Sequence, residues 1–141
     1  MLSIGFVGFG EAASEISRGL SENENVRVYA HDVLLSDRAR RPVLQEKANA
    51  CKVTLCDSIA ELAKNVEVVF STVPCAVAYQ AATQVIPHLR PDQIFVDLNA
   101  ITPAVAEKIA AAVQKTGALF VDGAMVGSLT AKKHKVPTLV S

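Results

Sequence analysis

A chain of 141 residues, 50% of them hydrophobic, is long enough for about one domain with a substantial core, since a domain of this size buries roughly 68% of its unfolded surface. The 14 Lys and Arg residues balance 14 Asp and Glu residues, and neither half of the chain carries a long run of one sign. The charge pattern therefore argues against nucleic acid or an anionic membrane as a partner and favours a small molecule.

The first residues are typical of a strand that passes through a tight turn into a helix. An apolar run over 2–7 meets Gly8 and Gly10, and a helix-prone segment with Ala13 completes the spacing G-x-G-x-x-A. Gly8 permits the sharp turn, Gly10 has no side chain to keep a pyrophosphate from the backbone, and Ala13 lets the helix lie close to the sheet. The first N–H groups of that helix lack intrahelical partners and would face the phosphates. The sequence thus predicts a dinucleotide site, whose first candidate residues are Gly8, Phe9, Gly10, Glu11 and Ala12.

The second predicted strand ends beside a carboxylate. After a helix over 11–20, residues 26–30 predict this strand, and Asp32 stands just beyond its end, 22 residues after Gly10. At this place an acidic side chain receives the adenine ribose hydroxyls of NAD. A carboxylate there also repels a 2'-phosphate by about 4 kcal/mol at ~4 Å and an effective dielectric of ~20. Asp32 therefore favours NAD over NADP.

Three arginines keep both coenzymes open. Arg38, Arg40 and Arg41 follow Asp32 in a predicted loop, and any of them would grip a 2'-phosphate in a bidentate contact if it turned inward. The equally simple interpretation is three solvated arginines ahead of a helix that begins at Pro42. The predicted cofactor is therefore NAD or NADP, with a small preference for NAD.

Helices and strands alternate through the rest of the chain. Periodicity and capping residues predict a helix over 42–50, a strand over 52–55, a helix over 58–64, a strand over 66–71, a helix from Pro74, a strand over 93–98, a helix from Thr102 to Gly117 and a strand over 118–121. This alternation predicts an α/β fold of the Rossmann type. We expect a doubly wound, mainly parallel sheet in the order 3-2-1-4-5-6, with helices on both faces.

Two strand ends supply further candidate residues. Thr72, Val73 and Pro74 leave the strand over 66–71 at the carboxyl edge, where open α/β sheets bind ligands, so all three are candidate cofactor contacts. Asn99 ends the strand over 93–98 and is a candidate as well. It would either hydrogen-bond the nicotinamide or the substrate, or cap the nearby turn.

The pattern changes after the sixth strand. Residues 122–128 are small, flexible and apolar, and they predict a loop near the nicotinamide. Met125, Gly127 and Ser128 in this loop are candidate substrate contacts. Lysines and His134 over 132–135 predict a solvated basic turn, which could also attract an anionic substrate. Residues 137–140 have the pattern of the start of another strand.

The cysteines and the N-terminus indicate a cytoplasmic location. Cys51, Cys56 and Cys75 are odd in number and lack C-x-x-C spacing, which argues against a disulfide framework and against a metal site. No basic segment precedes the first apolar run, and no apolar stretch approaches the length of a membrane span. We therefore expect free thiols, a reducing compartment and no membrane association.

Taken together, these motifs resemble the cofactor domain of the β-hydroxyacid dehydrogenases, which include 6-phosphogluconate and 3-hydroxyisobutyrate dehydrogenases. The matching stretches are the glycine turn over 5–10, Asp32, the exit over 72–74, and the segments over 96–99 and 121–124, in family order over essentially the whole chain. The resemblance implies that residues 1–141 form an NAD(P)-binding Rossmann domain. It also implies a helical C-terminal domain, absent from this chain, that supplies the catalytic lysine and most of a homodimer contact.

The resemblance implies an oxidoreductase that transfers hydride between a nicotinamide cofactor and a small, anionic hydroxy or keto acid-like substrate. No lysine of this chain matches the family's catalytic motif, so no catalytic residue is assigned and the chain alone is expected to be inactive. The family's substrate-binding serine is replaced by Val126, with Ser128 two residues later. This departure is similar to the divergent phosphogluconate-dehydrogenase-like branch. Two alternatives stay open: a non-catalytic dinucleotide-binding or regulatory module, and a C=N reductase of the imine type.

Overall fold

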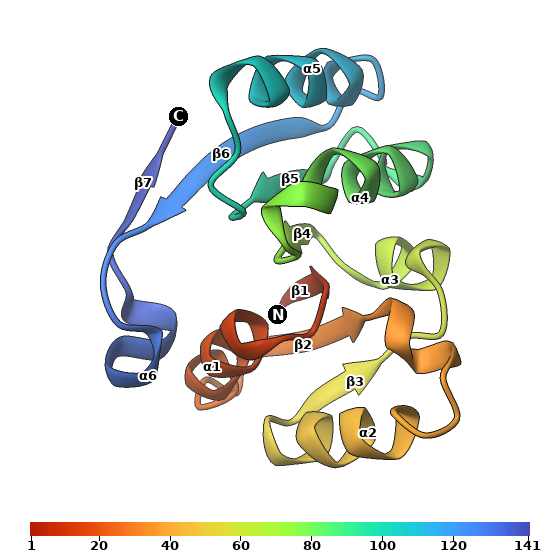
Figure 1. Ribbon diagram of the computed structural model, residues 1–141, viewed down its shortest axis with the longest axis vertical. Helices are drawn as coiled ribbons and strands as arrows, with labels where there is room; N and C mark the ends of the chain where they lie inside the picture. Colours follow the sequence, from red (N-terminus) through yellow and green to blue (C-terminus); the bar gives the residue numbers. More distant parts are fainter.

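The short apolar runs of the sequence form one twisted sheet in the computed structural model, which describes residues 1–141 (Figure 1). Its strands are β1 Leu2–Val7, β2 Val26–His31, β3 Val53–Leu55, β4 Val68–Ser71, β5 Ile94–Asp97, β6 Leu119–Met125 and β7 Thr138–Val140. The order across the sheet is β3-β2-β1-β4-β5-β6-β7, and neighbouring strands are parallel except for β6 and β7. The predicted Rossmann-type order of the first six strands is confirmed.

Helices cover both faces of the sheet, as Figure 1 shows. They are α1 Glu11–Leu20, α2 Arg41–Ala50, α3 Ile59–Asn65, α4 Ala78–Val85, α5 Pro103–Gln114 and the short α6 Leu129–Lys132. No helix has the length and apolar character needed to cross a bilayer. Strand β1 shows how the two layers are held, because its side chains alternate: Ile4 and Phe6 join the apolar cluster under α1 and α2, whereas Val7 joins the cluster under α3, α4 and α5.

The end of the chain differs from the prediction. The expected loop over 122–128 is wrong for its first part, because β6 continues to Met125. Strand β7 lies antiparallel to this extension, with Gly123 opposite Val140 and Met125 opposite Thr138. A small, flexible segment becomes a strand here because a distant segment supplies its hydrogen-bond partners, which local pattern does not reveal.

The basic segment over 132–135 is not a free turn. It closes α6 and forms a 3-10 helix, Lys133–Lys135, against α1. Gly19 of α1 is buried there, and a Cβ at this position would collide with the ring of His134. Lys133 Nζ lies 3.3 Å from Glu22 Oε1. The predicted turn is therefore a short helical segment docked on α1, in which Lys132, His134 and Lys135 are exposed to solvent as predicted. The missing side chain of Gly19 makes room for it.

Two further boundaries shift around the sheet edge. The chain passes from Pro74 through a 3-10 helix, Cys75–Val77, before α4 begins. A second 3-10 helix that the sequence pattern missed, Val33–Ser36, follows β2 and is capped by Asp32. The predicted helix from Pro42 begins one residue earlier, at Arg41.

All three cysteines are free, and Cys56 titrates abnormally. Its thiol is buried in the cluster under α3, α4 and α5. Burial first, and the nearby carboxylates of Glu61 and Asp57 second, raise its pKa from 9.0 to about 11.

This shift predicts a loss of stability at alkaline pH. Between pH 9 and pH 11 the unfolded chain releases the Cys56 proton while the folded chain retains it, so the free energy of unfolding falls as pH rises through this window, by about 2–3 kcal/mol. Urea unfolding at the two ends of the window, on the parent and on Cys56→Ala, measures the effect. Comparison with the variant cancels the contributions of all other titrating groups. An equal fall in the free energy of unfolding in both proteins would contradict the assignment to Cys56.

Candidate dinucleotide site

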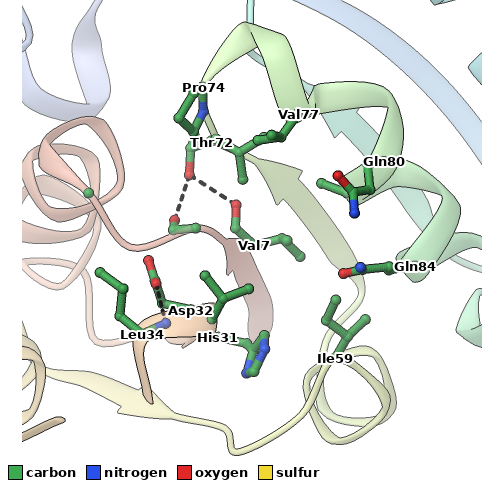
Figure 2. A pocket seen from close by; sticks show the side chains of 15 residues that line it. Val7, His31, Asp32, Leu34, Ile59, Thr72, Pro74, Val77, Gln80 and Gln84 are labelled. Carbon is green, nitrogen blue, oxygen red and sulfur yellow. Dashed lines mark hydrogen bonds between the residues drawn. The ribbon is translucent and has the colours of Figure 1, made fainter. Parts of the chain in front are cut away.

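A cavity of about 430 Å³ opens at the carboxyl edge of the sheet, between the ends of β1, β2 and β4 and the side of α4 (Figure 2). Six of its lining residues are ones that the sequence singled out, namely Gly8, Gly10, Asp32, Thr72, Val73 and Pro74. The others are Val7, His31, Val33, Leu34, Ile59, Val77, Gln80, Ala81 and Gln84. This size is that of ordinary small-molecule sites, which span about 300–1,000 Å³.

The glycine turn is locked to the exit of β4. Gly8 has φ +88°, a conformation that side chains rarely adopt, and a Cβ there would collide with the Thr72 carbonyl oxygen and lie 2.8 Å from Val73 Cγ1. Thr72 N donates to the Val7 carbonyl at 2.9 Å. Thr72 Oγ1 donates to the Gly8 carbonyl at 2.8 Å and lies 3.4 Å from the Val7 carbonyl oxygen (Figure 2). Two neighbouring strand ends thus fix the turn in place.

The turn delivers an open helix N-terminus to the cavity. Gly10 is the N-cap of α1 and makes no side-chain capping bond. The first intrahelical donor is Ser14, whose N–H reaches the Gly10 carbonyl at 3.1 Å, so Glu11, Ala12 and Ala13 offer N–H groups without helical partners. A Cβ built on Gly10 meets no atom within 4 Å. Free donors, the positive end of the helix dipole and open space fit a pyrophosphate.

Asp32 orders this turn as well as lining the cavity. Its Oδ2 accepts the Phe9 N–H at 2.8 Å, and its Oδ1 accepts the Leu34 N–H at 2.9 Å. Each carboxylate oxygen has a second acceptor position, so ribose hydroxyls could still donate to Asp32. Phe9 lies differently from its neighbours: its ring is buried in the core, and its carbonyl accepts from Lys47 Nζ at 3.1 Å. Phe9 therefore positions the turn from behind and does not line the cavity.

The opposite wall comes from α4 and was missed by sequence reasoning. Gln80, Ala81 and Gln84 of α4 follow the spacing of one helix face, and Val77 directly precedes the helix. Figure 2 shows the amides of Gln80 and Gln84 directed from the helix into the cavity. The neighbouring face, with Ala78 and Val85, packs on the sheet, and its apolar periodicity was the feature that predicted the helix from the sequence. The polar half of this helix could have been found from its period and from its start after the Thr72-Val73-Pro74 exit.

His31 lies on the cavity floor between Asp32 and Ile59 (Figure 2). Its Nδ1 is 2.9 Å from the Cys56 carbonyl oxygen, which can only accept, so Nδ1 carries the proton. The other ring nitrogen of the neutral imidazole is then an acceptor. Amides from α4 and this imidazole are the groups that could recognise the edge of a base, within otherwise apolar walls.

Asn99 joins two strand ends and does not line the cavity. Its Oδ1 accepts the Val73 N–H at 2.8 Å, and its Nδ2 donates to Ser71 Oγ at 2.8 Å. Its own N–H donates to Oδ1 of the buried Asp97, whose pKa is raised by burial. In this structure the side chain of Asn99 is committed to holding the β4 exit, which lies on the cavity wall.

The candidate substrate residues lie apart from this cavity. Met125 ends β6 and packs against the cluster under α1 and α2. Gly127 has φ +122° in the following turn, and Ser128 caps α6 by accepting the Ala131 N–H at 3.3 Å. The structure thus brings the glycine turn, Asp32 and the β4 exit together and leaves Met125, Gly127 and Ser128 outside.

This arrangement defines a class of protein. In this sheet the first strand turns through glycines into a helix without a side-chain cap, and a carboxylate directly follows the second strand. These features define a Rossmann-type dinucleotide-binding domain. The family follows from comparison with known proteins. A family model described as the NAD binding domain of 6-phosphogluconate dehydrogenase matches residues 3–140, and the chain belongs to that family.

Individual relatives agree with this assignment. Human mitochondrial 3-hydroxyisobutyrate dehydrogenase is 22% identical over 134 residues, which cover 92% of this chain and 38% of that protein. A conserved hypothetical protein of Sinorhizobium meliloti 1021 is 34% identical, with a TM-score of 0.93 over 99% of this chain and 46% of its own. Mycobacterium tuberculosis 3-hydroxyisobutyrate dehydrogenase, solved with L-serine, is 23% identical, with a TM-score of 0.84 over the same shares.

The fold extends to enzymes of other names. An imine reductase variant from Myxococcus stipitatus, in complex with NAD+, is 19% identical with a TM-score of 0.72 over 92% of this chain and 42% of its own. The imine reductase from Myxococcus stipitatus in complex with NADP+ is 15% identical, with a TM-score of 0.71 over 90% and 42%. The chain spans less than half the length of all these relatives.

Proposed function

We propose that this chain binds NAD in preference to NADP, as the coenzyme half of a dehydrogenase or reductase. The bound nicotinamide would supply the hydride chemistry. The residues of this chain bind and orient the dinucleotide: α1 receives the pyrophosphate, Asp32 the adenine ribose, and α4 the base. The observation that carries the proposal is the open N-terminus of α1, where Gly10 faces free space next to a carboxylate at the end of β2.

The preference for NAD rests on Asp32. Its carboxylate lines the cavity with one acceptor position free on each oxygen, which suits the two hydroxyls of an unmodified ribose. A 2'-phosphate at the same place would meet a negative charge. Arg38 and Arg40 do not line the cavity, and Arg40 lies 3.9 Å from Asp37.

The remaining parts of the proposal concern a longer protein. Its substrate would be a small, anionic hydroxy or keto acid, reduced or oxidised with the help of a lysine from a helical domain, and the protein would be a cytoplasmic homodimer. Support comes from the family and from the free thiols of this chain. Asn99 and the segment from Met125 to Ser128 would approach the nicotinamide side, since both follow strands at the same edge of the sheet.

One observation favours reduction of a C=N bond as a second candidate. Val126, which stands where the β-hydroxyacid dehydrogenases carry a substrate-binding serine, is 54% exposed and offers no hydroxyl. The hydroxy acid dehydrogenase and the imine reductase differ in which substrate joins the protein and the coenzyme. Saturation-transfer NMR on the NADH-loaded chain would favour the first if 3-hydroxyisobutyrate contacts the protein and the second if only a cyclic imine does.

Calorimetric titration of the chain with NADH and NADPH tests the main proposal. We expect NADH to bind with a lower Kd than NADPH. In a separate assay with NAD+, we expect the chain to show no turnover of 3-hydroxyisobutyrate. Circular dichroism on the same sample establishes that the protein is folded. Absence of binding by a folded sample would refute the dinucleotide site, and tighter binding of NADPH would refute the preference for NAD.

A further inference from the structure

A second cavity, of about 370 Å³, adjoins the ribose end of the dinucleotide cavity. The two share His31, Asp32 and Val33, and the second is also lined by Leu35, Ser36, Arg41 and Asp57. A phosphate on the ribose hydroxyl that Asp32 receives would project past Asp32, toward this second space. Arg41 is the one lysine or arginine that lines it. Among the three arginines that follow Asp32, Arg41 is therefore the one placed to meet a 2'-phosphate.

Arg41 is held by other partners, however. Its Nη2 donates to Asp57 Oδ1 at 2.7 Å, and its Nη1 donates to the Leu35 carbonyl at 3.3 Å. Asp57 is in turn fixed by the start of α3, because its N–H donates to Glu61 Oε2 at 2.8 Å. The planar fork that makes arginine a good phosphate ligand is thus turned toward a carboxylate of the protein itself.

The charges of this cavity also oppose a phosphate. Two carboxylates, Asp32 and Asp57, and one guanidinium, Arg41, face it, so the negative charges outnumber the positive one. Neutralising Asp57 would reverse this balance locally and release the fork of Arg41 at the same time. The side chains of Arg41 and Asp57 are 49% and 69% exposed, so neither is part of the core, and Asp57 can be replaced by asparagine without opening a cavity.

We propose that Asp57 is a specificity-determining residue for the coenzyme: by holding Arg41 in an ion pair, it excludes the 2'-phosphate of NADP from the second cavity. This inference rests on the proposed dinucleotide binding and adds a residue from the third strand's exit to a choice otherwise assigned to Asp32. The chain therefore carries a cationic side chain that could bind the phosphate, Arg41, but Asp57 keeps it in an ion pair.

The test compares the Kd values of NADH and NADPH for the parent and for Asp57→Asn. We expect Asp57→Asn to shift the ratio about tenfold toward NADPH, the size of one charge-assisted hydrogen bond gained. Adding Arg41→Ala to Asp57→Asn is expected to remove the gain. Asp37→Asn is the matched control, because it frees Arg40, which lines neither cavity, and should leave the ratio unchanged.

The outcomes separate this inference from the proposed function. An unchanged ratio in Asp57→Asn, with NADH still bound, overturns the role of Asp57 and leaves dinucleotide binding intact. If the relative gain in NADPH affinity persists after Arg41→Ala, the role of the Arg41–Asp57 pair is overturned, because loss of the Asp57 charge alone would then explain the gain. Failure of the parent to bind either nucleotide refutes both the proposed function and the inference that rests on it.

Discussion

Gly10→Ala is expected to lose nucleotide affinity by about a hundredfold to a thousandfold while the domain stays folded. A methyl group at this position points into the space where the pyrophosphate would approach the N–H groups of α1, and it touches nothing else within 4 Å. Loss of two hydrogen bonds to a charged group, at about 1.5–2 kcal/mol each, gives this magnitude. The free energy of unfolding should fall by less than about 1 kcal/mol, the cost of alanine in place of glycine at an N-cap.

Gly8→Ala is the matched comparison, two residues earlier in the same turn. Here the methyl group would be forced into a positive φ and against the Thr72 carbonyl and Val73. Strain and displacement together should lower the free energy of unfolding by about 2–4 kcal/mol, in addition to the loss of binding. Urea unfolding and calorimetric titration on both variants measure the contrast. If Gly10→Ala binds NADH as tightly as the parent, no phosphate sits at the α1 N-terminus.

The second large effect is expected at Asp32. Asp32→Asn should weaken NADH by about tenfold or more, because a charge-assisted hydrogen bond to the ribose becomes a neutral one. It should not weaken NADPH in the same proportion, because the repulsion of the 2'-phosphate is removed, so the ratio of the two Kd values is expected to change by about a hundredfold or more. Titration of both nucleotides against the parent and the variant gives this ratio directly.

A stability measurement accompanies that experiment. Asp32 also accepts the N–H groups of Phe9 and Leu34, and an asparagine oxygen can replace only one carboxylate oxygen. Asp32→Asn should therefore destabilise the fold by about 1 kcal/mol, and Asp32→Ala by more. A ratio of NADH to NADPH affinity that is the same in the parent and both variants would remove Asp32 from coenzyme choice, whatever the stability shows.

Asp57 and Asp32 are both expected to influence the choice between NADH and NADPH. Both residues carry negative charge toward the same small cavity, but Asp32 acts directly on the ribose while Asp57 acts through Arg41. The double variant Asp32→Asn with Asp57→Asn thus measures whether the two effects are additive. Residues that share a cavity commonly couple by about 0.5–3 kcal/mol.

Much of the site could be found from the sequence because its chemistry is local. Each small residue in the turn from Gly8 to Ala13 meets a local steric requirement: one tolerates a positive φ, one leaves space for an anion, and one allows the helix to approach the sheet. Asp32 was located by counting from the turn, since β2 lies beside β1 in a fixed register with Val7 opposite His31. The β4 exit followed in the same way, because Ser71 pairs with Val7.

The sequence by itself thus determined the class of fold and the phosphate-facing turn, because these depend on periodicity and on the steric needs of single residues. The order of the first six strands followed from their alternation with helices, because parallel strands joined by right-handed crossovers allow few arrangements. Tertiary structure decided what depends on contacts between distant segments. These are the α4 wall with Gln80 and Gln84, the bonds from Asn99 to the β4 exit, the pairing of β7 with β6, and the ion pair that turns Arg41 toward Asp57. Such contacts join residues far apart in the chain, and their energies reside in the packed arrangement, so no local pattern contains them.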